Sequence, residues 1–337
     1  MRTTKELSKR WIGIDGGGTK TSCVIGDEHG HLLASAVGSA SNIQGVSLDK
    51  VRSTLLALID KVIIDSKSTL QQVESIYLCL AGADRESDRV VIRGLFQKTD
   101  YESKIQITND AKAAFVAGTW GETGLLLIAG TGSIVFAQSK ETGQVIRVGG
   151  WGYLLGDEGS GFYIGKHALN AVLKSFDKRE QETLLTELLL NHFQITDARE
   201  LISIYSDELL IPKIANLSKY VIEAAKKEDA IAKSILFDSV NELIEMVLAA
   251  NRQLVEPSKL LVLHGGMFAD SYFKELFVNG LSTRINNITI VQSELPAVVG
   301  AYLLALIDDG RRISSDIKGN VYKTWNQLQH YLIEELK

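Results

Sequence analysis

Short apolar runs separated by glycine-rich turns begin the patterned part of the chain. Trp11–Asp15 is an apolar run and Gly16–Gly18 a turn. Lys20–Ile25 consists of β-type residues, and a second turn at Asp27–Gly30 leads to the run His31–Val37. Runs of this length joined by tight turns are typical of antiparallel strands. The pattern therefore predicts a three-stranded meander.

The hydrophobic spacing then becomes helical. Apolar residues recur at intervals of three and four between Leu48 and Val62, which predicts an amphipathic helix. The segments SIYLCLAG and KIQIT follow as buried strands, and RVVIRGLFQ between them predicts a further helix. Strands that alternate with helices indicate that this part of the sheet is parallel.

The same order of elements recurs in the second half of the chain. GLLLIAGTGSIVFAQS predicts a strand, a Gly/Thr turn and a strand, and GQVIRVGG predicts a third strand. From Gly161 to about residue 256 the pattern is mostly helical. KLLVLHGGMF and ITIVQ then predict strands, and PAVVGAYLLALI and the C-terminal segment predict helices. This weak internal repeat, with DGGGT and AGTGS in matching turns, predicts two lobes of one architecture.

Composition narrows the possible functions. The 337 residues are 45% hydrophobic and 23% charged, with a net charge of −5, which is typical of a globular protein large enough for two domains. Lys and Arg form no block, and no apolar run is long enough for a membrane span or a signal peptide. We therefore expect neither nucleic-acid nor membrane binding. Cys23 and Cys79 lack CxxC spacing, which excludes a cysteine-held zinc or iron–sulfur site and fits the cytoplasm.

The glycine-rich turns are candidates for phosphate binding, although two common motifs do not fit them. Thr19 follows Gly18 where a Walker A loop requires lysine, and neither turn has the G-x-G-x-x-G spacing of dinucleotide sites. A hairpin turn of glycine and threonine can instead direct backbone N–H groups and a hydroxyl at a phosphate. Two matched turns, with a third glycine pair at Gly265–Gly266, favour nucleotide binding over plain hairpin turns.

Five motifs, taken together, resemble a known family. GIDGGGTKT, NDAKAAFVAG, AGTGS, GGWGYLLGDEGSG and LHGGM resemble the N-acetylglucosamine kinase branch of the sugar kinase/Hsp70/actin superfamily, which is grouped with the BadF/BadG-type ATPases. The resemblance covers residues 11 to about 305. It implies an α/β fold of two ribonuclease H-like lobes, the actin/hexokinase-like ATPase fold, with an ATP cleft between them. We assign residues 1–117 to the N-terminal lobe and 118–312 to the larger C-terminal lobe. A C-terminal helix at about 313–337 is a candidate to pack on the N-terminal lobe.

The resemblance assigns the nucleotide contacts to the three turns. The implied phosphate and ATP contacts are Gly16, Gly17, Gly18, Thr19, Lys20, Gly130, Thr131, Gly132, Ser133, Gly265 and Gly266. Asp15 is implied to hold Mg²⁺ through water. From the residues alone, Asp15 also fits a turn-forming acid at a strand end.

The resemblance likewise assigns the sugar contacts and the catalytic base. The implied sugar contacts are Asn42, Gly82, Gly150, Trp151 and Asp157, and the implied base is Asp110. Each has a simpler alternative. Trp151 fits a core position equally well, and Asp157 and Glu158 fit acids near a helix that begins at Ser160. Asp110 and its neighbour also fit the N-cap of the following helix, a role compatible with that of a base.

The expected activity is ATP-dependent phosphorylation of an amino sugar. N-acetylglucosamine, converted to its 6-phosphate, is the first choice, with glucosamine and N-acetylmuramic acid close behind. Ile134, Ala81 and Ala83 replace residues that are more polar or smaller in relatives, which leaves the preference for the acyl group open. By family analogy we expect a cytoplasmic homodimer. The alternative is a nucleotide-switched ATPase that drives a partner protein, which would not need Trp151 and Asp157 in a sugar pocket.

Overall fold

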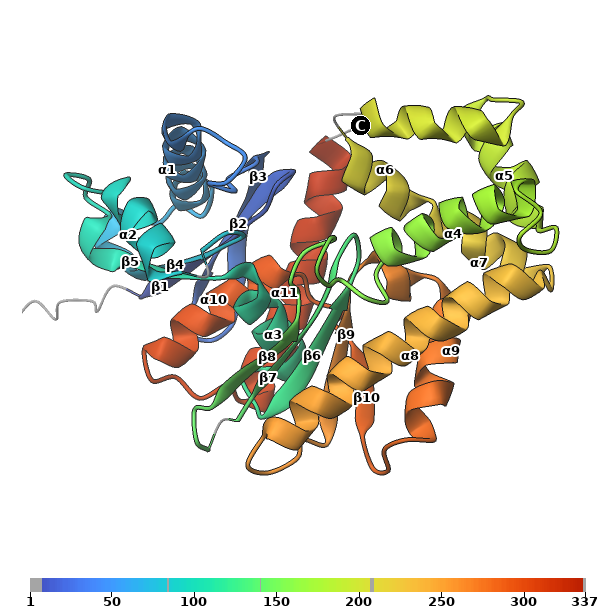
Figure 1. Cartoon of the computed structure of the whole chain (residues 1–337). Coiled ribbons are helices and arrows are strands. Elements are labelled where there is room, and N and C mark those ends of the chain that lie inside the picture. Colours follow the sequence, from blue (N-terminus) through green and yellow to red (C-terminus); the bar gives the residue numbers. More distant parts are fainter. Residues whose placement is uncertain (1–7, 84, 140, 207–208, 336–337) are drawn as a thin grey trace, which may run out of the picture. The chain divides into compact units, whose positions relative to one another are not determined.

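The computed structural model describes residues 8–83, 85–139, 141–206 and 209–335 (Figure 1). Contacts between residues divide the chain into two compact units. The described residues up to Glu122, together with those from Ser293 onward, form the first unit, and Thr123–Gln292 form the second. Each unit is built on one five-stranded mixed sheet.

The sheet of the first unit contains the predicted meander. Its strands, in the order β3-β2-β1-β4-β5, are β1 (Arg10–Gly16), β2 (Lys20–Asp27), β3 (Leu32–Ser39), β4 (Val73–Leu80) and β5 (Ile105–Thr108). β1 pairs antiparallel with β2, and β2 with β3, which confirms the meander. On the other side of β1, β4 and β5 run parallel to it, as the alternation of strands and helices predicted.

Helices cover both faces of this sheet because β1 is apolar on both. Ile12 and Ile14 pack into a buried cluster with residues of α1 and α2, whereas Gly13 lies against α10. The helical elements of the first unit are α1 (Leu48–Asp65), η1 (Leu70–Gln72), α2 (Glu86–Gly94), η2 (Glu102–Lys104), α3 (Asp110–Thr119), α10 (Ala297–Asp308) and α11 (Ser315–Glu335). α10 contacts α3, and α11 contacts β3.

The sheet of the second unit repeats the topology of the first. Its strands, in the order β8-β7-β6-β9-β10, are β6 (Gly124–Ala129), β7 (Ser133–Gln138), β8 (Val145–Gly149), β9 (Leu260–His264) and β10 (Thr289–Gln292). β6, β7 and β8 form an antiparallel meander, and β9 and β10 continue from β6 in parallel. The shared topology confirms the internal repeat and the α/β fold class.

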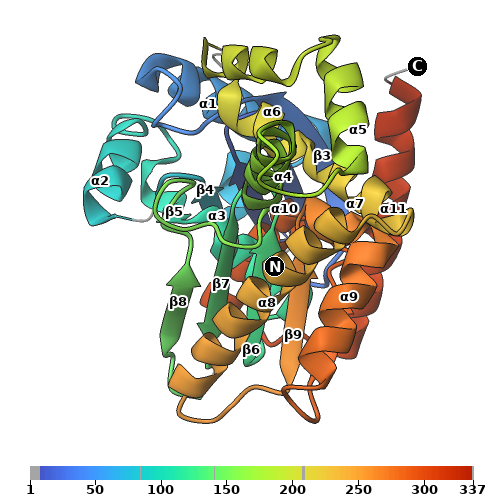
Figure 2. The same cartoon turned by 45° about the vertical axis from the view of Figure 1, so that its right-hand side comes forward.

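A long helical segment joins β8 to β9, as the sequence predicted. Its elements are α4 (Gly161–Phe176), α5 (Leu184–Phe193), η3 (Ala198–Ser206), α6 (Leu210–Asn216), α7 (Ser218–Lys226) and α8 (Ala230–Gln253), and η4 (Gly266–Ala269) and α9 (Ser271–Ser282) follow β9. Figure 2 shows α8 running alongside the sheet, where it contacts β6, β7 and β8. No helix in the described ranges is long and apolar enough to cross a lipid bilayer.

The boundary between the units differs from the predicted one. Residues 118–122 and 293–312, which we assigned to the second lobe, group with the first unit. The reason is the close approach of α10 to β1 and α3. A Cβ atom on Gly13 would lie 2.1 Å from Tyr302 N, and one on Gly300 would lie 1.9 Å from Ala113 O. At both places, only hydrogen in place of a side chain lets the backbones come this close.

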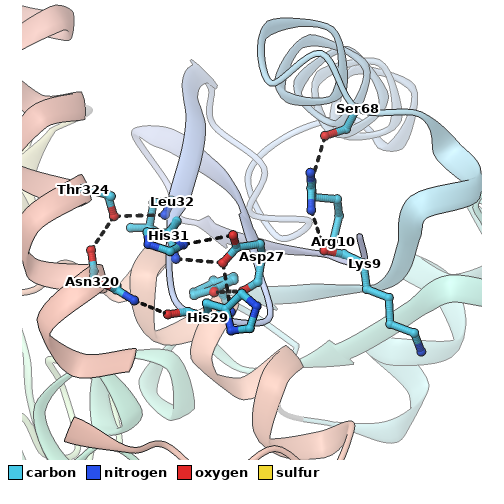
Figure 3. Close-up of polar contacts among 10 residues, drawn as sticks. Lys9, Arg10, Asp27, His29, His31, Leu32, Ser68, Asn320 and Thr324 are labelled. Carbon is cyan, nitrogen blue, oxygen red and sulfur yellow. Dashed lines mark hydrogen bonds and ion pairs between the residues drawn. The ribbon is translucent and has the colours of Figure 1, made fainter. Parts of the chain in front are cut away.

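α11 fixes the turn between β2 and β3 (Figure 3). Asn320 Nδ2 donates to the carbonyl of His29 at 2.8 Å, and Leu32 N donates to Thr324 Oγ1 at 3.0 Å. Within the turn, His31 Nδ1 lies 3.0 Å from Asp27 Oδ2. The described residues contain no group of three or more His, Cys, Asp or Glu side chains that could hold a metal ion.

The contact of α10 predicts an unequal effect of alanine at two helical glycines. Gly300→Ala should lower the free energy of unfolding by roughly 1–3 kcal/mol, because the added methyl group overlaps backbone atoms of α3. Gly319→Ala in α11, where a Cβ atom would meet nothing within 4 Å, should raise it by roughly 0.5–1 kcal/mol. Urea unfolding curves measure both. Equal effects of the two substitutions would contradict the close packing.

Candidate active site

The functional residues of the first unit gather at one edge of its sheet. β1, β4 and β5 are parallel, so their carboxyl ends share this edge, where ligands bind in open α/β sheets. Asp15 lies opposite Cys79 on β4, and Cys79 lies opposite Thr108 on β5. Ala81 N also donates to Gly16 O at 2.8 Å. This register brings Asp15 and Asp110, which begins the helix after β5, to the same edge.

The two carboxylates influence each other. Burial, and after it the negative charge of Asp110, raise the pKa of Asp15 from 3.8 to about 6. The positive charge of Lys20 opposes this rise. Two carboxyl groups in partly dehydrated surroundings disfavour full ionisation of both. They suit Mg²⁺, which binds proteins through one or two carboxylates together with substrate phosphates and water. The residues present therefore fit the magnesium role expected of Asp15.

The first phosphate turn follows β1 and is closed by a hydrogen bond from Gly17 N to Lys20 O of 3.1 Å. A Cβ atom on Gly17 would meet only Lys20 O, at 3.9 Å, and one on Gly18 would meet nothing within 4 Å. Neither glycine has a positive φ. The packing of the protein thus does not require glycine at either position. Open space over a backbone of N–H groups fits a phosphate that approaches the turn closely.

Gly16 is a glycine for a different reason. Its Cβ atom would lie 2.0 Å from Ser41 Oγ, so the packing of the neighbouring segment excludes a side chain there. That segment is held to the turn by hydrogen bonds from Ser41 N and Asn42 N to Gly17 O. The predicted phosphate turn and the predicted sugar contact Asn42 are therefore parts of one hydrogen-bonded structure.

Asn42 and Gly82 are neighbours in the first unit. Asn42 Oδ1 accepts a hydrogen bond from Gln44 N at 2.9 Å, so Asn42 can offer a ligand its amide N–H donors. Gly82 has a φ of +83°, and a Cβ atom on it would lie 3.0 Å from Asn42 Oδ1. Glycine at this position both permits the backbone conformation and leaves room beside the amide.

The structure assigns the cap of α3 to Asn109. Asn109 Oδ1 accepts a hydrogen bond from Lys112 N at 3.0 Å, and Asn109 has the extended backbone of an N-cap residue. Asp110 is the first residue of the helix, and its Oδ1 accepts from Ala111 N at 2.9 Å. The N-cap residue of this pair is thus Asn109, and Asp110 is the first residue inside the helix.

The second predicted phosphate turn joins β6 to β7. It forms hydrogen bonds within itself and with the segment before α4. Gly130 N donates to Gly132 O at 2.9 Å within the turn. Ser133, predicted to contact phosphate, is only 3% exposed, and its hydroxyl donates to Glu158 O at 2.6 Å. Its N–H donates to Asp157 Oδ1 at 3.3 Å. Both donors of Ser133 are therefore engaged by the segment before α4.

Trp151 is not a core residue. Its side chain is 65% exposed, and Arg147 Cζ lies 5.0 Å from the centre of its ring. The Arg147 guanidinium also donates to Gly150 O, so one side chain fixes both predicted sugar contacts. Gly150 has a φ of +70°, and a Cβ atom on it would lie 2.4 Å from Ile134 Cδ1. The sequence analysis missed Arg147, although a cation four residues before an aromatic was the available signal.

Asp157 is held in a defined orientation. Its φ is +58°, and burial raises the pKa of its carboxyl group, while hydrogen bonds from the N–H groups of Ser133 and Gly152 oppose this rise. The alternative role for Asp157 and Glu158, as acids of a helix start, does not hold. Ser160 caps α4 by accepting from Tyr163 N, and the first turn of α4 contains no acid.

A cavity of about 760 Å³ lies within the second unit, beside the same turn. Gly130, Thr131 and Gly266 form part of its wall. A Cβ atom on Gly266 would meet nothing within 4 Å, whereas one on Gly265 would lie 2.3 Å from Ala129 O. Of the predicted glycine pair, Gly266 therefore faces the cavity and Gly265 is required by packing.

Helices α6 and α7 supply the wall that the sequence analysis missed. The lining includes the apolar residues Pro212, Ala215, Ile222 and Met267 and the polar residues Asn216 and Lys219. The lining residues of α6 and α7 lie in helical sequence without a glycine motif, so no local signal marked them, whereas Met267 directly follows Gly266. A cavity of this size, mostly apolar with a few polar groups, suits a ligand the size of a nucleoside.

Comparison with known proteins gives a consistent result. The profile of the BadF/BadG/BcrA/BcrD ATPase family matches residues 12–305. The N-acetylmuramic acid/N-acetylglucosamine kinase of Clostridium acetobutylicum is 34% identical over 87% of this chain and 97% of its own. The N-acetyl-D-glucosamine kinase of Dictyostelium discoideum is 35% identical over 88% and 97%. A solved Chromobacterium violaceum structure, proposed to be an N-acetylglucosamine kinase, has the same fold, with a TM-score of 0.70 at 23% identity over 89% and 99% of the two chains.

The raised pKa of Asp15 predicts how the metal-free protein responds to pH. The folded pKa of about 6 exceeds the ordinary 3.8, so the ionised carboxylate opposes folding, and stability falls as pH rises from about 4 through 6. Asp15→Asn removes this cost. In the presence of a chelator, the variant should be more stable than wild type by up to about 3 kcal/mol at pH 8 and by much less at pH 4.5.

Thermal unfolding at the two pH values measures this effect. Asp49→Asn, the same change at an exposed acid in the first turn of α1, is the matched control and should give no gain in stability at pH 8, because a carboxylate there favours the helix. A stability difference between Asp15→Asn and wild type that is the same at both pH values would contradict the raised pKa.

Proposed function

The chain belongs to the BadF/BadG/BcrA/BcrD ATPase family, and we propose that it is an ATP-dependent kinase of amino sugars that converts N-acetylglucosamine to its 6-phosphate. The observation that carries the proposal is the pair of relatives at 34% and 35% identity, each matched over 97% of its length and each named as a kinase of N-acetylglucosamine. Glucosamine and N-acetylmuramic acid remain the next candidates for the substrate.

Asp110 is the proposed catalytic base. It accepts the proton of the sugar 6-hydroxyl as that oxygen forms a bond to the γ-phosphorus and the bond to the β-phosphate oxygen breaks. Its position at the edge of the sheet near Asp15, and the assignment of the capping role to Asn109, support this choice. Asp15 would hold Mg²⁺ through water, and the bound cation neutralises charge on the phosphate oxygens.

The phosphates of ATP are proposed to lie on the two glycine turns. The N–H groups of Gly18 and Thr19 in the first unit and of Thr131 in the second would donate to them, whereas those of Gly17 and Gly130 close the turns themselves. The cavity beside Gly266 is the proposed site of the adenosine, because its walls combine apolar side chains, which suit a purine, with polar and charged ones, which suit a ribose.

The sugar is proposed to contact Asn42, Gly82, Gly150, Trp151 and Asp157. The exposed face of Trp151 suits the C–H groups of a pyranose, and the Asp157 carboxylate suits its hydroxyl groups. The contacts of Arg147 with Trp151 and with the Gly150 carbonyl would hold this surface in place. A homodimer in the cytoplasm remains our expectation for the assembly.

The alternative is an ATPase that drives a partner protein, since the family's name covers ATPases as well. An exposed tryptophan and a half-buried, oriented carboxylate on one glycine-rich segment favour a small polyhydroxylated acceptor. The two functions predict different responses to added sugar.

A panel of amino sugars tests the proposal directly. ATP consumption should be slow alone and should rise by at least about tenfold with N-acetylglucosamine, because water is a poor acceptor until a sugar completes the site. Release of ADP and formation of sugar 6-phosphate are measured for N-acetylglucosamine, glucosamine and N-acetylmuramic acid, with glucose as the comparison. Rapid ATP hydrolysis that no sugar changes would instead support the partner-driving ATPase.

Asp110→Asn separates catalysis from folding. The amide keeps the size of the side chain but cannot accept the proton, so turnover should fall by roughly 10²–10⁴. Sugar affinity should change far less, because the amide still forms hydrogen bonds. The melting temperature should not fall, since Asn109 provides the cap.

Steady-state kinetics, sugar titration and thermal unfolding measure these three properties. Asp49→Asn, the same chemical change in the first turn of α1, is the control and should retain full turnover. Near-normal turnover in a folded Asp110→Asn protein would remove Asp110 from the mechanism.

A further inference from the structure

The turn between β6 and β7 and the segment before α4 are joined by four hydrogen bonds. Ser133 N–H donates to Asp157 Oδ1 at 3.3 Å, and Ser133 Oγ donates to Glu158 O at 2.6 Å. Gly161 N donates to Gly130 O at 2.8 Å, and Phe162 N donates to Thr131 O at 3.2 Å. The turn between β6 and β7 thus holds the segment that leads into α4.

The contact is tight as well as polar. A Cβ atom on Gly132 would lie 2.8–3.0 Å from three atoms of the Asp157 carboxyl group. A side chain at position 132 would therefore displace the Asp157 carboxylate, independently of any phosphate. Asp157 itself has a φ of +58°, a conformation that side-chain-bearing residues adopt rarely and keep only when neighbours fix it. The Ser133 N–H is one of those neighbours.

This contact connects two groups that the proposed function assigns to different substrates. Gly130 and Thr131 belong to the ATP side and line the cavity, whereas Asp157 belongs to the sugar side. We propose that Ser133 is a positioning residue through which bound nucleotide orients Asp157 for the sugar, so that the two substrates bind cooperatively. The inference rests on the proposed kinase function and deepens it.

The physical basis is the shared ordering of one turn. Phosphate bound to the Thr131 N–H restricts the turn, and the turn restricts Asp157 and its neighbour Glu158 through the backbone N–H and the hydroxyl of Ser133. A second ligand then meets a site that is already ordered and loses less entropy on binding. Coupling of this kind is reciprocal, so nucleotide and sugar raise each other's affinity by the same factor, commonly about 5–150.

Ser133→Ala is the test substitution. It removes the hydroxyl bond to Glu158 O but keeps the backbone N–H bond to Asp157, so the turn is loosened rather than rebuilt. The matched control is Ser139→Ala, just beyond the other end of β7. Ser139 is also buried, and its hydroxyl lies 3.2 Å from Glu141 Oε2, away from both proposed binding regions.

Calorimetric titration of N-acetylglucosamine with and without a non-hydrolysable ATP analogue measures the coupling factor. Wild type and Ser139→Ala should share a factor of at least about 5, and Ser133→Ala should fall to about 2 or less. In steady-state kinetics the KM for sugar at saturating ATP should rise in Ser133→Ala by about the factor lost. A merely structural role would lower stability and leave the coupling factor unchanged.

The outcomes separate the coupling from the kinase function. If wild type binds both ligands without mutual effect, or if Ser133→Ala couples them as wild type does, the proposal is wrong and the kinase function stands. If wild type binds no amino sugar, the proposed function fails and the coupling fails with it.

A second measurement covers the case in which Ser133→Ala does not fold. The ATP analogue alone should slow amide hydrogen exchange at least about threefold in wild-type residues 157–162, since these N–H groups and carbonyls contact the turn. Unchanged exchange in this segment would overturn the proposal.

Discussion

The repulsion between two carboxylates at one edge of a sheet is the constraint on which the first unit's chemistry depends. Parallel pairing of β1, β4 and β5 brings Asp15 and the start of α3 to the same edge. Burial and the Asp110 charge then raise the pKa of Asp15 to about 6. A partly buried pair of acids is unfavourable in an isolated protein and favourable around a cation, which supports the proposal of a metal–nucleotide substrate at this edge.

The parts of the fold that the sequence predicted correctly are those that depend on residues close together in the chain. Both meanders, the helices that follow them and the cap at Asn109 were visible because glycine turns, β-type runs and capping residues act within a few positions. The glycine turns after β1 and β6 were visible for the same reason. Gly17, Gly18 and Gly266 have open space where a side chain would stand, as expected of a backbone that approaches a ligand.

The features that sequence did not predict depend on contacts between distant residues. α10 returns to the first unit because Gly300 meets the backbone of α3, and nothing in the helical pattern of α10 indicates which sheet it covers. The engagement of Ser133 by the entry to α4 and the cavity walls from α6 and α7 are likewise products of the fold. Trp151 could be assigned neither to the core nor to the surface until its exposure was known.

The discontinuous first unit also bears on synthesis by the ribosome. The second unit is a continuous stretch and can fold once Gln292 has emerged, whereas the first unit lacks α10 until Ala297–Asp308 have been synthesised. At about 5–20 residues per second, the Gly13 face of β1 waits roughly 15–60 s for its covering helix. During that interval an apolar sheet face is available to chaperones and to other nascent chains.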